Sequence, residues 1–159
     1  SMSITGDFTG QSNKTILYQG FDANYIPQGT RVTFSGYMLN PSHDMIRANN
    51  QAYLSIDQFF SGSVSLNNST LLLNHTSESI TENHSTDEWH YFEVSSTTQQ
   101  NTNYLQMRIN YEQFNDDSGT VFIDDLSITT SNNKLMLFEK HSALHTTIDD
   151  RMVENLPGP

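Results

Sequence analysis

The residues with the clearest binding chemistry occupy alternate positions in short, strand-like segments. In residues 104–111 apolar side chains alternate with four polar or aromatic ones, Tyr104, Gln106, Arg108 and Asn110. Because successive residues of a strand point to opposite faces, we expect these four to point away from the core. The same alternation places Tyr37 and Tyr53 on the outer faces of their own strands.

Sugars are bound by aromatic rings that stack on C–H surfaces, while amide, guanidinium and carboxylate groups hold the hydroxyls. These six residues therefore predict a sugar-binding groove, provided that their strands share one concave sheet. The alternative is a set of ordinary exposed tyrosines on a domain without a ligand.

The sequence offers no catalytic constellation. A glycosidase on a β-scaffold needs two carboxylates across a cleft, and no strand-like segment carries alternating acidic residues. Asp116 and Asp117 fall in a turn, and the adjacent Asp124 and Asp125 are expected to point to opposite faces. A Gly-x-Ser-x-Gly elbow, a phosphate loop and cysteine are all absent from the sequence. We predict that the chain is not an enzyme.

Charge and composition narrow the possible partners. The 159 residues suit one domain, and their formal net charge of −11 disfavours nucleic acid and anionic membranes. No apolar run is long enough to cross a bilayer, so membrane insertion is not expected. Cysteine is absent, which excludes disulfides and thiolate zinc sites. The surface is rich in Asn, Gln, Ser and Thr with only 16% charged residues, which suits a secreted or cell-surface β-domain. We interpret Ser1 and Met2 as an expression remnant.

Short alternating segments with turn residues between them predict an all-β domain over residues 3–130. About eight strands at this spacing are typical of a jelly-roll β-sandwich of two antiparallel sheets. The expected strands cover residues 15–21, 31–39, 51–57, 62–73 (one or two strands), 88–94, 104–111 and 121–130.

Residues 131–159 are expected to form a C-terminal extension. Residues 133–139 are apolar enough for a further strand. A short helix near residues 148–155 is expected, with Thr147 as its N-cap, acidic residues in its first turn and Pro157 ending it. A frayed terminus is the alternative.

Four segments, taken in order, resemble the β-sandwich carbohydrate-binding modules of families four, nine and twenty-two, which have a galactose-binding-domain-like jelly roll. They are residues 17–19 (LYQ), 28–37 (QGTRVTFSGY), 86–89 (TDEW) and 119–126 (GTVFIDDL), and the resemblance spans residues 4–130. It implies a non-catalytic module that binds a polysaccharide or other glycan and is appended to a larger exported protein. In the family pattern the position of Trp89 is structural, so we expect Trp89 to be a packing residue. The rival interpretation is a structural or adhesion domain of a large surface protein without a sugar site.

The resemblance also implies a structural calcium ion. The aspartates of the closing segment, Asp124 and Asp125, correspond to a position that often ligates calcium in these modules, and Asp7 is a further ligand by its position. The alternative is that one aspartate bonds a turn and the other is solvated.

The opening strand of the family is missing here, and its nearest match is residues 133–139 at the other end of the chain. Because the first and last strands of a jelly roll are neighbours, this segment can fill the vacant position, and Glu139 would then supply a carboxylate. A coincidental apolar strand is the other interpretation.

Overall fold

The computed structural model describes residues 1–6, 10–22, 26–61, 69–114, 119–131, 135–137, 144–148 and 151–156. These residues form a 3-10 turn, η2 (Ser42–Asp44), and the strands β1 (Met2–Thr5), β2 (Asn13–Asp22), β3 (Arg31–Leu39), β4 (Gln51–Ser61), β5 (Ser69–Ile80), β6 (Trp89–Thr97), β7 (Tyr104–Gln113), β8 (Thr120–Thr130), β9 (Leu135–Leu137), β10 (Leu144–Ile148) and β11 (Arg151–Leu156). None of the helical segments in this part of the chain is long and apolar enough to span a membrane.

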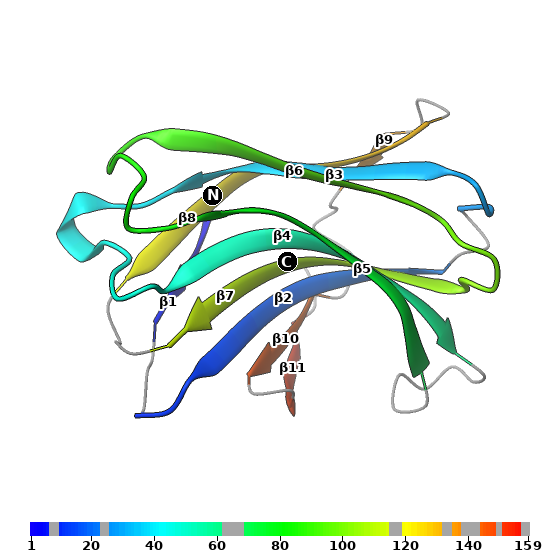
Figure 1. Ribbon diagram of the computed structural model, residues 1–159, viewed down its shortest axis with the longest axis horizontal. Helices are drawn as coiled ribbons and strands as arrows, with labels where there is room; N and C mark the ends of the chain where they lie inside the picture. Colours follow the sequence, from blue (N-terminus) through cyan, green and yellow to red (C-terminus); the bar gives the residue numbers. More distant parts are fainter. Residues whose placement is uncertain are drawn as a thin grey trace.

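The strands form two antiparallel sheets packed face to face (Figure 1). The five-stranded sheet has the order β1-β8-β3-β6, with β9 also paired to β8, and the six-stranded sheet has the order β11-β10-β2-β7-β4-β5. The first eight strands thus follow the order 1-8-3-6 and 2-7-4-5, as in a jelly roll. The predicted all-β sandwich of two antiparallel sheets is confirmed.

The core lies between the sheets and is built from the inward residues of each alternating strand. Phe34 and Met38 of β3 belong to the same core cluster as Leu54 of β4 and Met107 of β7, and all four are fully buried. Each such side chain stabilises the fold by roughly 1.5–3 kcal/mol relative to an exposed one. Because one side of each strand is buried in this core, only the opposite side can contact a ligand.

A β-bulge in β8 changes the directions of the two aspartates. Ser35 pairs with Ser127 and Tyr37 with Asp124, so Gly36 alone opposes Asp125 and Leu126. Asp125 has φ +49°, and Leu126 packs against the core. The Asp124 side chain is 45% exposed and Asp125 is also exposed, so neither enters the core. The expectation that they point to opposite faces is wrong, because a bulge inserts one residue and breaks the alternation.

The C-terminal extension adds strand β9 to the five-stranded sheet and strands β10 and β11 to the six-stranded sheet. β9 pairs with the end of β8 on the edge whose first part pairs with β1, because β3 occupies the other edge. A strand is therefore present within residues 133–139. Whether it replaces a strand of the family, and whether a domain boundary lies at residue 130, stay predictions.

The prediction of a helix near residues 148–155 is wrong. Arg151–Leu156 is strand β11, which pairs with β10, and β10 pairs with residues 15–19 of β2. A helix this short gains little from its own hydrogen bonds, whereas the open edge of β2 offers a row of backbone partners. The acidic residues 149–150 and Pro157 lie outside the described residues.

Candidate functional site

One outer face of the six-stranded sheet collects most of the residues expected to bind sugar. Alternate residues of β7, such as Met107, point into the core, so Tyr104, Gln106, Arg108 and Asn110 emerge on the opposite side. Cross-strand pairing brings Tyr53 of β4 beside Asn110, and Tyr18 of β2 beside Arg108. We call this surface the polar face. Its members are Lys14, Tyr18, Tyr53, Asp57, Phe59, Tyr104, Gln106, Arg108, Asn110 and Glu112.

Arg108 stands at the centre of the polar face with its side chain fixed by neighbours. Its Nη1 lies 3.0 Å from Asp57 Oδ2, and its Nε donates to Gln106 Oε1 at 2.8 Å. Asp57 also accepts from Asn74 Nδ2 at 2.6 Å, and only 2% of Asp57 is exposed. The guanidinium lies 5.5 Å from the centroid of the Phe59 ring. These contacts orient the fork of donors before any ligand arrives.

Tyr104 forms an aromatic wall beside this arginine. Its ring centroid lies 6.3 Å from that of Phe59. Its hydroxyl end crosses over Gly20 of β2, where a Cβ atom would overlap it. Glycine at this position therefore lets the tyrosine lie flat against the sheet. Burial raises the pKa of Tyr104 and of Tyr18, so both stay protonated phenols at neutral pH.

Tyr53 belongs to a second polar cluster at the other end of the polar face. Its hydroxyl donates to Glu112 Oε1 at 2.7 Å and accepts from Lys14 Nζ at 2.8 Å. Lys14 Nζ also lies 3.3 Å from Glu112 Oε1, and Gln51 Nε2 donates to Glu112 Oε2 at 2.8 Å.

The electrostatics of this cluster keep Glu112 ionised. Burial raises the pKa of Glu112, but the hydrogen bonds from Gln51 and Tyr53 and the charge of Lys14 outweigh that effect, and the pKa ends below its usual value. Burial, followed by the hydrogen bond to Glu112, raises the pKa of Tyr53. The pair is therefore a neutral donor beside a charged acceptor.

Only part of the polar face is open to solvent. Asp57, Gln106 and Asn110 are at most 3% exposed, and Asn110 Nδ2 donates to Ser55 Oγ at 3.0 Å. Tyr53, Tyr104 and Arg108 are partly exposed. A ligand can therefore contact these three directly, while the buried amides hold them in place.

Tyr37 does not belong to this surface, and its expected place in the groove is wrong. It lies on β3 of the other sheet, beside Tyr91 of β6, with ring centroids 5.3 Å apart and planes tilted by 59°. Trp89, expected to be a packing residue, is 45% exposed on the same strand as Tyr91. The packing expectation is wrong because β6 turns Phe92 and Val94 inward, so residues in odd-numbered positions face out.

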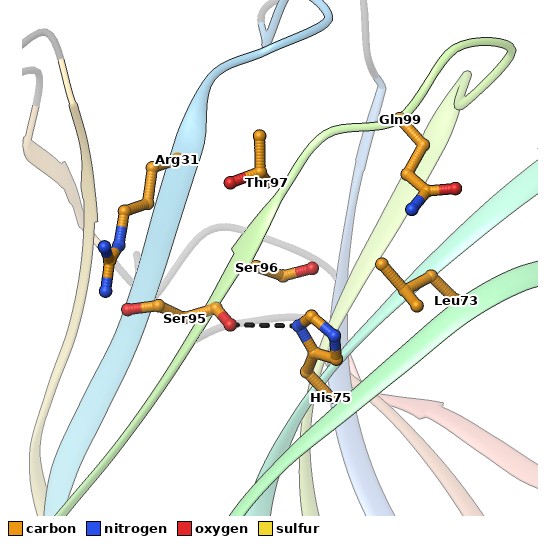
Figure 2. A pocket seen from close by; sticks show the side chains of 7 residues that line it. All are labelled: Arg31, Leu73, His75, Ser95, Ser96, Thr97 and Gln99. Atoms are coloured by element: carbon orange, nitrogen blue, oxygen red, sulfur yellow. Dashed lines mark hydrogen bonds between the residues drawn. The ribbon is translucent and has the colours of Figure 1, made fainter.

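Two hollows lie along β6, on the side where it approaches β5. One of about 420 Å³ is lined by Glu78, His84, His90, Tyr91, Phe92 and Glu93. The other, of about 250 Å³, is lined by Arg31, Leu73, His75, Ser95, Ser96, Thr97 and Gln99 (Figure 2). In the smaller hollow the Nδ1 atom of His75 is hydrogen-bonded to the carbonyl oxygen of Ser95 at 3.0 Å, and Arg31 lies across β6 from His75 (Figure 2).

The aspartates expected to hold calcium do not form a metal site with other described residues. The Asp125 backbone N–H donates to Asp124 Oδ1 at 3.0 Å, and the amino group of Ser1 lies 3.5 Å from the same oxygen. Within the described ranges no group of three or more His, Cys, Asp or Glu side chains is placed to hold an ion. Calcium takes six to eight oxygen ligands, so this donor set alone does not fit it. Asp7 and Glu139 lie outside the described residues, and calcium stays a prediction.

Comparison with known proteins gives a likeness of fold. No family model matches the chain, and no curated protein matches it. A solved structure from Clostridium thermocellum is similar, the CBM22-1 and GH10 modules of N-terminal endo-1,4-beta-D-xylanase 10B complexed with xylohexaose. It is 14% identical, with a TM-score of 0.45, and the match covers 76% of this chain and 20% of that one. The chain thus spans one fifth of the length of that protein.

Proposed function

We propose that this domain binds a neutral polysaccharide through its polar face and does not change it chemically. In this role it is a module of a larger exported or cell-surface protein that holds that protein close to its glycan. The observation that carries the proposal is the fixed guanidinium of Arg108 on the same face as the partly exposed rings of Tyr53 and Tyr104.

The chemistry of this surface favours a sugar over other ligands. Rings that lie on a sheet offer flat contacts for pyranose C–H groups, and the Arg108 fork and the Glu112 carboxylate offer a donor and an acceptor for hydroxyls. Because Asp57 and Gln106 hold Arg108 in position beforehand, little side-chain entropy is lost on binding. The two positive side chains, Lys14 and Arg108, are each beside a carboxylate, so the polar face suits a neutral ligand.

A structural or adhesion role is the second candidate, and one observation favours it. Asp57, Gln106 and Asn110 are buried and bonded to neighbouring side chains, as expected of a network that serves the sheet itself. A purely structural face would keep these bonds and bind no sugar.

Glycan-array screening followed by calorimetry tests the proposal. Neutral polysaccharides should bind, and Tyr53→Ala or Arg108→Lys should weaken binding by roughly tenfold or more, which corresponds to about 1.4 kcal/mol. Phe114→Ala is the matched control, because Phe114 is also an exposed aromatic residue (39% exposed), follows the end of β7 and is not a member of the polar face. If no neutral plant, algal or bacterial polysaccharide binds, the binding function is rejected and the structural role is favoured.

A further inference from the structure

The opposite side of the sandwich carries an exposed aromatic row that the proposed function does not use. Tyr37, Trp89 and Tyr91 are 39%, 45% and 53% exposed, and they lie on the neighbouring strands β3 and β6. We call Tyr37, Trp89, Tyr91 and the adjacent Glu93 the aromatic face. Large exposed rings gathered on one surface usually mark a binding site.

The aromatic face continues into the hollow of about 420 Å³ beside β5. Tyr91 and Glu93 belong to both, and Glu78, His84, His90 and Phe92 complete the lining. The Tyr91 hydroxyl donates to Glu93 Oε2 at 2.9 Å, which holds the ring in place in the lining of the hollow.

The imidazoles of the hollow are also held in place. His90 Nε2 is hydrogen-bonded to the carbonyl oxygen of Ser85 at 3.0 Å, and His84 Nδ1 accepts from the Thr81 backbone N–H at 3.2 Å. Their ring centroids lie 5.0 Å apart in a T-shaped arrangement. The hollow is thus walled by oriented side chains.

We propose that the aromatic face and this hollow form a second binding site, which takes sugar residues of a neutral polysaccharide. The exposed rings offer stacking surfaces, and the Glu78 and Glu93 carboxylates accept hydrogen bonds from hydroxyls. A volume of about 420 Å³ lies within the range of roughly 300–1,000 Å³ that small-molecule sites occupy.

Charge and ring geometry favour a neutral ligand over an anionic one or a quaternary ammonium group. The described residues that line the hollow include two carboxylates and no Lys or Arg, which disfavours an anionic glycan or a phosphate. A quaternary ammonium group is best held by rings that enclose a gap, as in an aromatic cage. Tyr37 and Tyr91 instead contact each other, with centroids 5.3 Å apart. A neutral sugar fits both features.

The two sites have a joint consequence, which rests on the proposed function of the polar face. The aromatic face belongs to the five-stranded sheet and the polar face to the six-stranded sheet, so they lie on opposite sides of the sandwich. Packed sheets are about 10 Å apart, and a straight glycan segment cannot reach both outer surfaces. The domain would therefore bind two separate glycan segments, one on each face.

The closing experiment uses Trp89, the single tryptophan of the chain, as a built-in reporter. The protein is titrated with neutral hexasaccharides (xylohexaose and cellohexaose), and Trp89 emission is followed together with calorimetry. We expect an emission shift and two sites per chain. Tyr53→Ala should remove one site and keep the emission shift, and Tyr91→Ala should remove the other site together with the shift. Phe114→Ala should keep both, and melting curves establish that each variant is folded.

The outcomes separate the two proposals. Unchanged emission with one site that Tyr53→Ala removes would overturn the second site and leave the polar face as the binding surface. An emission shift with one site that only Tyr91→Ala removes would support the second site and reject the polar face. An emission shift with oligolysine and none with the hexasaccharides would overturn the second site in favour of a basic partner, and no heat and no shift would overturn both proposals.

Discussion

The ion pair between Arg108 and Asp57 allows a quantitative test of how the polar face is built. The perturbation is Arg108→Gln, which leaves the Asp57 carboxylate, whose side chain is 3% exposed, without its counter-charge. Removing one partner of a buried ion pair costs about 3–5 kcal/mol. The Arg108 side chain is 23% exposed, and Asn74 still donates to Asp57, so we expect a smaller loss, about 2–3 kcal/mol.

A double-mutant cycle isolates the pair itself. In Asp57→Asn combined with Arg108→Gln no buried charge remains, so the double variant should lose less than the sum of the single variants, with a coupling of about 1–2 kcal/mol. The assay is urea unfolding at pH 7, followed by circular dichroism. With a slope of about 1–3 kcal/mol per molar urea, a loss of about 2–3 kcal/mol lowers the midpoint of Arg108→Gln by roughly 0.7–3 M.

The control for this cycle is Arg31→Gln, the same substitution at an exposed arginine. Its free energy of unfolding should change by less than about 0.5 kcal/mol. If the two single losses simply add in the double variant, Arg108 and Asp57 are not coupled. Asp57 would then not hold the guanidinium in position before a ligand arrives, and the proposal of a preorganised site would be rejected.

Three further predictions address the bulge, the acidic cluster and the metal. Gly36→Ala should lower the free energy of unfolding by about 1–3 kcal/mol, because a Cβ there would lie 2.7 Å from Leu126 Cδ2. Thermal melts measure this, and an unchanged midpoint would show that the Leu126 side chain can move aside. Folding lowers the pKa of Glu112, so its ionised form stabilises the protein at pH values above the usual pKa of 4.5, and this contribution is lost as the pH falls through the lower folded pKa. The difference in stability between wild type and Glu112→Gln should thus shrink below pH 4.5. A difference that stays constant with pH would contradict this prediction. A chelator that removes bound calcium should lower the melting midpoint, and Asp124→Asn should abolish that response. A midpoint that does not change with the chelator would contradict a structural calcium ion.

The architecture could be predicted because alternation in the sequence records burial directly. Residues 31–39 show it most clearly, since Val32, Phe34 and Met38 are buried and Tyr37 is exposed, as their positions indicate. Alternation fails where the backbone changes its register. At Asp125 the bulge adds a residue opposite Gly36, and this extra residue has no signature in the polarity pattern, so the direction of the aspartates was predicted wrongly.

The tail shows a different limit. Residues 147–155 carry the N-cap and first-turn residues of a helix, yet Thr147 and Ile148 belong to β10, which pairs with β2, and Arg151–Leu156 is strand β11, which pairs with β10. Local signals describe what a segment does when it is isolated. The open edge of β2 is a property of the assembled sheet, and its backbone partners outweigh the weak preference of a short helix.

The sites depend on a third kind of information, which is the sheet to which each strand belongs. Alternation shows that Tyr37 and Tyr53 leave the core, but they leave it on opposite sides of the sandwich because β3 and β4 lie in different sheets. Consecutive strands of a jelly roll often change sheets, so two outward residues that are close in sequence are poor evidence for one site. The same alternation in residues 89–93 places Trp89 and Tyr91 on the side opposite Phe92, which agrees with the exposure of Trp89, whereas the family pattern does not. A family pattern records what a position does in other sandwiches, whereas alternation records which side of this strand faces water. For an outer face, where rings are free to serve a ligand, alternation is the stronger evidence.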